Sequence, residues 1–176
     1  MNSLYMSVDI TDRQTIDSLK YCQILAKQKI KGNFVDDNSF HITVDFLGDN
    51  ETDINLVKEA MNLFKERYGE EYHSFYVFAN TLNRFDMGAA WIDVNNSFKL
   101  YQIHYLLQQL YQEVGYQKKK DKFEGYTPHI TFAYDTEEFI PFKLPRTPIL
   151  VDNISLWNSP KMNGEYITSA AHIIKL

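Results

Sequence analysis

Hydrophobic and polar residues alternate in three stretches of the chain, a pattern typical of β-strands with one buried face. These stretches cover residues 4–10, 40–47 and 129–133. Runs of β-branched and aromatic residues predict four further strands, at residues 75–79, 90–94, 149–157 and 166–174. Strict alternation in the second stretch divides its side chains between two faces, with Phe40, Ile42, Val44 and Phe46 on one and His41, Thr43 and Asp45 on the other.

Apolar residues spaced three or four apart predict amphipathic helices between the strands. The first helix is expected to follow a cap at Thr11 or Asp12 and to end near Gly32. The second carries apolar residues from Ile54 to Tyr68. Gly69 follows it, where a left-handed C-terminal cap is expected.

A third helix is predicted after the polar cluster at residues 95–97. Its apolar residues run from Leu100 to Val114, and Gly115 is expected to close it. The order of elements is then β-α-β-α-β-β-α-β-β-β, which indicates an α+β fold. A helix followed by a histidine-bearing strand occurs twice, so we expect residues 1–176 to form one domain with two pseudo-symmetric lobes that face each other across a cleft.

Composition excludes several classes of protein. The chain has 176 residues, of which 44% are hydrophobic and 23% charged, enough for one core. It has no apolar run of the roughly 20 residues that cross a bilayer, and its start lacks a secretory leader. The single cysteine, Cys22, cannot form an internal disulfide. We therefore expect a soluble monomer of the reducing cytoplasm, without membrane contact.

Charge limits the choice of ligand. Lysine and arginine total 18 against 23 acidic residues, a formal net charge of -5. Proteins that grip long phosphate backbones usually present a basic surface, so long RNA or DNA is not expected. A small nucleotide, a cyclic nucleotide or a short RNA end remains compatible with this charge.

The tripeptide His-Ile-Thr occurs twice, at residues 41–43 and 129–131, in two predicted strands. Residues two apart on a strand point to the same side, so each strand offers an imidazole beside a hydroxyl. One such strand is explained by an ordinary surface or core histidine. Two copies with the same central isoleucine favour a shared site, in which two histidines and two threonines surround one tetrahedral anion.

Paired imidazoles suit phosphodiester cleavage. One neutral histidine can accept a proton from the nucleophile while the other, charged, protonates the leaving oxygen. Threonine hydroxyls can donate hydrogen bonds to the non-bridging oxygens, and no metal or other cofactor is needed. A mononuclear metal site made by His41, His129 and Asp45 is the rival hypothesis, although it leaves the paired threonines unexplained.

Both motifs resemble those of the two-histidine (2H) phosphoesterase superfamily, and most closely its bacterial RNA 2',3'-cyclic phosphodiesterase, or LigT-like, branch. The resemblance covers nearly the whole chain: the strand at residues 4–10, the two motifs as residues 40–48 and 126–133, the run at residues 83–85, and the last strands at residues 154–157 and 164–166. It implies a bilobal α+β fold, with antiparallel-sheet lobes and outer helices around a central cleft. It also implies metal-independent hydrolysis of 2',3'-cyclic or 2'-5' phosphodiesters. His41 and His129 take the catalytic positions in this resemblance, and Thr43 and Thr131 hold the phosphate.

Two positions depart from the family pattern and make the expected site less cationic. Tyr134 stands where the RNA-directed branch usually has an arginine, and Asp45 stands where a basic residue is common. They favour a small substrate, including cyclic oligonucleotide signals of the kind that viral members of the superfamily degrade. A binding module that sequesters such a nucleotide without turnover is the competing class.

Further residues are candidates for substrate binding. Arg84 is a replacement for the missing arginine, with a surface salt bridge as the alternative. Aromatic side chains can stack on bases, although each can equally belong to the core. These candidates are Phe34, Phe85, Tyr134 and Trp157. The lysine-rich run at residues 118–122 can dock phosphate or form a solvated loop.

Overall fold

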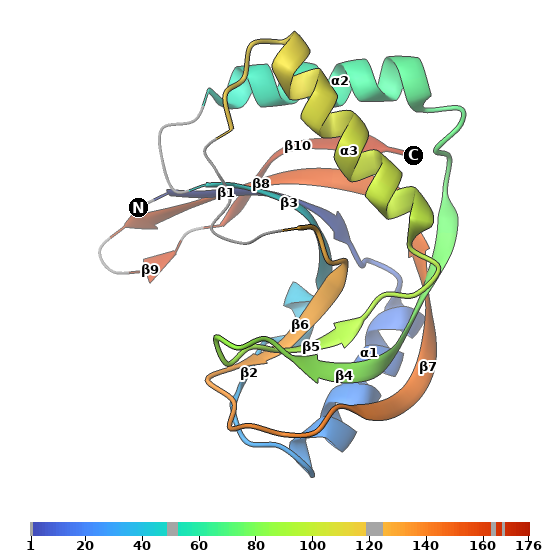
Figure 1. The fold of residues 1–176 in the computed structure, drawn as a ribbon, viewed down its shortest axis with the longest axis vertical. Coiled ribbons are helices and arrows are strands. Elements are labelled where there is room, and N and C mark those ends of the chain that lie inside the picture. Colours follow the sequence, from blue (N-terminus) through green and yellow to red (C-terminus); the bar gives the residue numbers. More distant parts are fainter. Residues whose placement is uncertain (1, 49–52, 119–124, 163–164, 167) are drawn as a thin grey trace.

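The computed structural model describes residues 2–48, 53–118, 125–162, 165–166 and 168–176, which form two antiparallel sheets (Figure 1). Sheet A has the strand order β10 (Ser169–Lys175), β8 (Asn153–Met162), β1 (Asn2–Asp9) and β3 (His41–Gly48), and β9 (Glu165–Tyr166) pairs with β8. Sheet B has the order β2 (Asn33–Phe34), β6 (His129–Tyr134), β5 (Ala90–Asp93), β4 (Phe75–Arg84) and β7 (Phe142–Val151). The two sheets contact each other through β3 and β6. This arrangement confirms the predicted α+β class.

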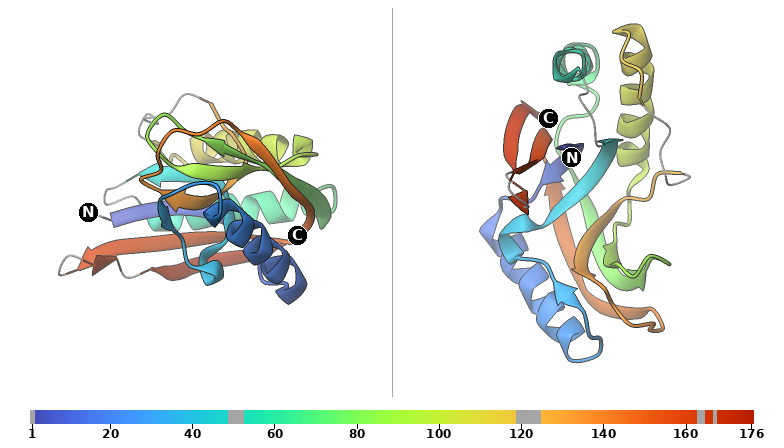
Figure 2. Two further views of the ribbon diagram at one scale, coloured as in Figure 1. Left: turned by 90° about the horizontal axis from the view of Figure 1, so that it is seen from below. Right: turned by 90° about the vertical axis from the view of Figure 1, so that its left-hand side faces the viewer.

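Three α-helices of the described residues pack on the sheets, at opposite ends of the molecule (Figure 2). Helix α1 (Arg13–Lys27) packs on sheet B, where Cys22 Sγ lies 3.4 Å from the Pro145 carbonyl oxygen of β7. Helices α2 (Ile54–Tyr68) and α3 (Phe98–Glu113) pack on sheet A, and the Tyr111 hydroxyl of α3 donates to Met6 Sδ of β1. None of the described helices is both long and apolar enough to span a membrane.

The helix ends are partly as predicted. Asp12 is the N-cap of α1, and its carboxylate accepts from the Thr15 amide at 2.8 Å. However, α1 ends at Lys27 rather than near Gly32, because the chain turns there and buries Ile30 in the core. Gly115 follows α3 with a left-handed φ of +79°, as expected.

Gly69 was expected to be left-handed, and that prediction is wrong. It caps α2 with a right-handed φ of -59°. A Cβ atom at this position would lie 2.4 Å from the Lys65 carbonyl oxygen, so the glycine is explained by the missing side chain rather than by an unusual backbone conformation.

The strand predicted at residues 149–157 is in fact parts of two strands in different sheets. β7 pairs with β4 in sheet B, and β8 pairs with β1 in sheet A, with the change at Asp152. β7 contains Pro145 and Pro148, which are tolerated because it is an edge strand. The strand predicted at residues 166–174 is likewise divided between β9 and β10, with residue 167 outside the described part of the chain.

A β-bulge corrects the expected faces of β3. Thr43 pairs with Ser7 and Asp45 pairs with Met6, so Val44 is an extra residue between two paired positions. An extra residue reverses the faces of the side chains that follow it. Asp45 is therefore buried on the α3 side, with 3% of its surface exposed, while Phe46 is 38% exposed on the face that carries Thr43.

Candidate functional site

The two motif histidines are the first residues of β3 and β6, the strands through which the sheets meet. The preceding Phe40 packs against Phe132 of β6, with ring centroids 5.5 Å apart. Both histidine side chains are half-buried, so neither imidazole is sealed from solvent. The structure thus brings together two motifs that lie 88 positions apart in the sequence.

Each histidine ring is held by the same hydrogen bond. His41 Nδ1 lies 2.8 Å from the carbonyl oxygen of Ser39, and His129 Nδ1 lies 2.6 Å from that of Thr127. A carbonyl only accepts, so Nδ1 carries the proton in both rings. In the neutral imidazole Nε2 is then the free acceptor, and it has no protein partner within the described residues.

The threonine hydroxyls are also available. Thr43 and Thr131 are half-buried, and neither hydroxyl is bonded to any group in the described part of the chain. The Thr43 backbone is fixed, because its carbonyl accepts from the Tyr126 hydroxyl at 3.1 Å. Burial raises the pKa of Tyr126, with smaller effects of Tyr101 and Asp45, so this hydroxyl stays a donor.

The surroundings of the two imidazoles differ. Phe85 and Trp91 stack on each other, and both make T-shaped contacts with the His129 ring, at centroid distances of 5.1 and 5.9 Å. His41 has one aromatic neighbour among the described residues, Tyr5, at 5.5 Å. Burial lowers the pKa of His129 below its usual value; the Thr127 carbonyl opposes this shift, and the charge of His41 adds to it.

Asp45 does not face the histidine pair. Its carboxylate accepts from Lys118 Nζ and, at 2.8 Å, from Gln108 Nε2, and it lies 3.9 Å from His104 Nδ1. These contacts hold the Asp45 carboxylate on the α3 side of the sheet, away from the face that carries His41 and Thr43. Within the described residues, no three His, Cys, Asp or Glu side chains gather closely enough to hold a metal, so the rival site of Asp45 with both histidines is not formed.

The predicted binding residues have varied environments. Phe85 contacts His129, and the indole Nε1 of Trp157 donates to Asp9, the cross-strand partner of His41, at 2.9 Å. Phe34 is half-buried in β2 beneath Lys27 Nζ, 5.1 Å from its ring centroid.

The two remaining candidates, Arg84 and Tyr134, are the last residues of β4 and β6 in sheet B. Arg84 donates through Nε and Nη2 to the Thr136 carbonyl, so these two groups are engaged by the protein backbone. Tyr134 ends β6 and is 53% exposed. Among the described residues Arg84 forms no salt bridge. In the lysine-rich run, Lys118 binds Asp45, and residues 119–122 lie outside the described part of the chain.

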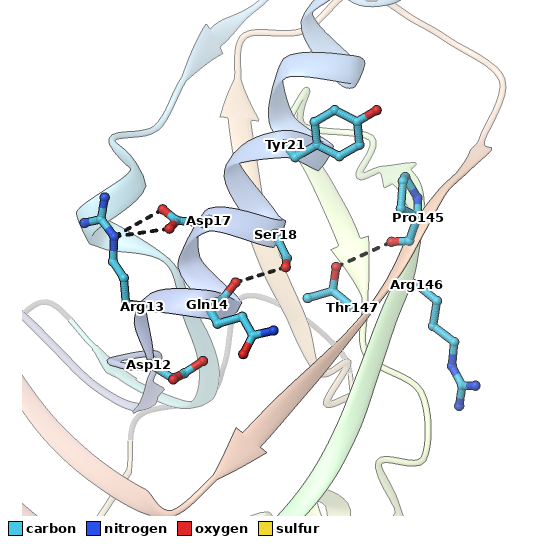
Figure 3. A pocket seen from close by; sticks show the side chains of 9 residues that line it. All are labelled: Asp12, Arg13, Gln14, Asp17, Ser18, Tyr21, Pro145, Arg146 and Thr147. Atoms are coloured by element: carbon cyan, nitrogen blue, oxygen red, sulfur yellow. Dashed lines mark hydrogen bonds and ion pairs between the residues drawn. The ribbon is translucent and has the colours of Figure 1, made fainter.

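A hollow of about 710 Å³ lies elsewhere, between the first turns of α1 and the middle of β7 at residues 145–147 (Figure 3). Its cations already have partners, because Arg13 pairs with Asp17 and the Arg146 guanidinium lies 3.8 Å from the Phe78 ring centroid. The hollow contains neither motif histidine. Its side chains do not converge on a common point in Figure 3, and it offers no comparable chemistry.

Sequence reasoning missed several contacts of the histidines. Neither Tyr5 nor Trp91 was singled out from the sequence, although both rings lie beside an imidazole. The carbonyls that fix the rings had a detectable signal: Ser39 and Thr127 each stand two positions before a histidine. The repeated unit is thus hydroxyl residue, any residue, His-Ile-Thr.

Comparison with known proteins identifies the fold and the family of this chain. A search of curated proteins gave no significant match. Three solved structures are similar in fold: LigT of E. coli with 3'-AMP (17% identity, 99% of this chain and 97% of that chain, TM-score 0.70), LigT of E. coli with ATP (16%, 99% and 98%, TM-score 0.69) and TT0787 of Thermus thermophilus (14%, 99% and 97%, TM-score 0.74). The family model of the 2'-5' RNA ligase superfamily matches residues 11–159. This chain belongs to the 2'-5' RNA ligase superfamily, the 2H phosphoesterases.

Proposed function

We propose that this protein is a metal-independent phosphodiesterase that hydrolyses 2',3'-cyclic or 2'-5' phosphodiester bonds in a small nucleotide or RNA end. The main support is the matched pair of imidazoles, each with Nδ1 bonded to a backbone carbonyl and Nε2 without a protein partner in the described residues. E. coli LigT has been solved with 3'-AMP, ATP and NADP+, which supports a nucleotide ligand for the present site.

The reaction follows from the four side chains. A water molecule attacks phosphorus, one imidazole removes its proton, and the other imidazole donates a proton to the ribose oxygen whose bond to phosphorus breaks. Thr43 and Thr131 donate to the non-bridging oxygens as negative charge builds there. The products are a phosphomonoester and a free hydroxyl, with the proton count balanced by water.

The unequal surroundings suggest which histidine is the base. The pKa of His129 is lowered, so its neutral form persists to lower pH and can accept the proton of water. His41 lies in a less enclosed position and takes the role of acid. Fixing Nδ1 as the protonated nitrogen leaves Nε2 of each ring as the atom that exchanges a proton with substrate.

The test is hydrolysis of 2',3'-cyclic AMP and of 2'-5'-linked ApA, with products identified by chromatography. We expect turnover by the native protein and a loss of about 100-fold or more in both His41→Gln and His129→Gln, the range for general acid–base groups. His73→Gln is the matched control, because that exposed histidine bonds only to the Glu70 carbonyl among the described groups. Tight binding without turnover would contradict the enzyme and support a sequestering module.

A cyclic oligonucleotide substrate is the second candidate. It is favoured by Tyr134, an exposed neutral side chain at the position where the RNA-directed branch has an arginine. Turnover of cyclic dinucleotides or trinucleotides faster than that of 2',3'-cyclic AMP would support it, and the same two histidine variants would abolish both reactions.

A further inference from the structure

The two motif strands share a second structural feature, a bulge at the third residue after each histidine. In β3 the extra residue is Val44, and in β6 it is Phe132, because Thr131 pairs with Trp91 while Ala133 pairs with Ala90. Residues 41–46 and 129–134 also have the same sequence of half-buried, buried and exposed positions. Each bulge returns the fifth residue after the histidine to the histidine's face.

Those fifth residues are both aromatic and exposed. Phe46 is 38% exposed and Tyr134 is 53% exposed, although phenylalanine in particular is usually buried. Phe46 lies close to the site. It pairs across the strands with Tyr5, and the ring centroid of Tyr5 is 5.5 Å from that of His41.

The two rings flank the histidines from opposite directions. Phe40, before the first histidine, contacts Phe132, which follows the second; Tyr126, before the second histidine, binds the Thr43 carbonyl, which follows the first. The motifs therefore pass each other antiparallel. Residues that follow the two threonines lie at opposite ends of the site, with the imidazoles and hydroxyls between them.

We propose that Phe46 and Tyr134 each stack on a nucleobase, so that the preferred substrate is a phosphodiester joining two nucleosides. The inference rests on the proposed function and narrows its substrate class from a terminal cyclic phosphate to an internal 2'-5' linkage. A flat ring stacks on any base, which supplies affinity without the cationic contacts of long-RNA binding proteins. The chemical step is unchanged: water adds to phosphorus and the leaving nucleoside takes the proton.

The decisive measurement is binding of 2'-5'-linked ApA and of 5'-AMP by calorimetry, with the His41→Ala, His129→Ala double variant as the parent so that the ligand stays intact. Phe46→Ala and Tyr134→Ala should each weaken ApA binding about 5- to 150-fold, the effect of one base–aromatic stack. Phe46→Leu should weaken binding similarly while keeping apolar bulk in the strand. Tyr76→Ala, which removes a 56% exposed tyrosine from the far end of β4, is the matched control and should change nothing.

A kinetic arm separates this inference from the proposed function. In the native protein kcat/KM should be higher for ApA than for 2',3'-cyclic AMP, and the Phe46 and Tyr134 variants should lose more with ApA. If the native protein hydrolyses 2',3'-cyclic AMP but the Phe46 and Tyr134 variants bind ApA as tightly as their parent, the inference is overturned and the proposed function stands. Ring-dependent ApA binding without turnover overturns the function alone, and absence of ApA binding overturns the inference.

Discussion

Replacing the two motif threonines is the sharpest test of how phosphate is held. Thr43→Val and Thr131→Val remove a hydroxyl and keep the β-branched shape that suits a strand. Neither hydroxyl is bonded within the described residues, so no protein hydrogen bond is lost and the folded state should keep its stability. The cost should fall on the transition state, where charge accumulates on the non-bridging oxygens.

The magnitude follows from one hydrogen bond to a charged group, which contributes about 1.5 to 3 kcal/mol. At about 1.4 kcal/mol for each factor of ten, each valine variant should lose roughly 10- to 150-fold in kcat/KM. Thr43→Ser and Thr131→Ser are the matched controls, since they keep the donor, and they should retain most activity.

The assay is steady-state hydrolysis of 2',3'-cyclic AMP and 2'-5' ApA, with thermal unfolding recorded for every variant. The proposed role of the threonines in binding phosphate would be refuted if the valine variants had the same unfolding temperature as the native protein and hydrolysed both substrates at its rate. A loss shared equally by the serine and valine variants would point instead to strand packing.

Three further predictions concern pH, folding and metal dependence. Because burial against Phe85 lowers the pKa of His129, Phe85→Leu should raise that pKa and move the acidic limb of the kcat/KM profile to higher pH. Phe98→Leu, at an exposed phenylalanine, is the control. An acidic limb that stays in place in Phe85→Leu would contradict the prediction. Asp45→Asn removes the buried carboxylate that accepts hydrogen bonds from Lys118 and Gln108, and it should lower the free energy of unfolding by about 1.5 to 3 kcal/mol in urea titrations, with kcat retained; a stable variant that had lost only activity would place Asp45 at the site after all. Hydrolysis should persist in excess EDTA, and activity lost in EDTA but restored by a divalent cation would favour a metal mechanism.

Local sequence pattern was sufficient for much of the fold and for the identity of the paired motifs. Period-two alternation predicted the strands at residues 4–10 and 129–133, and the Asp12 cap followed from the preference of short acidic side chains for helix N-termini. The family was also accessible, because the two His-Ile-Thr tripeptides lie in contiguous segments that can be compared directly with those of relatives. The catalytic roles assigned to those motifs stay predictions until the variants are measured.

Contacts between distant segments decided the rest. The alternation rule assumes that each residue of a strand pairs with one residue of the neighbouring strand. Whether a strand contains an extra, bulged residue depends on that neighbour, which the local sequence pattern does not describe. That is why Asp45 was expected beside His41 and is instead buried against Lys118, and why Phe46 was expected in the core and is exposed.

The division of residues 149–157 between two sheets has the same origin, since only pairing with β4 and β1 determines where one strand ends and the next begins. The sequence by itself determined which side chains are candidates for the chemistry, because residue type and short-range spacing are local properties. The tertiary structure decided which of them share a face and which rings surround each imidazole, because those depend on strand register and on packing between residues far apart in the chain.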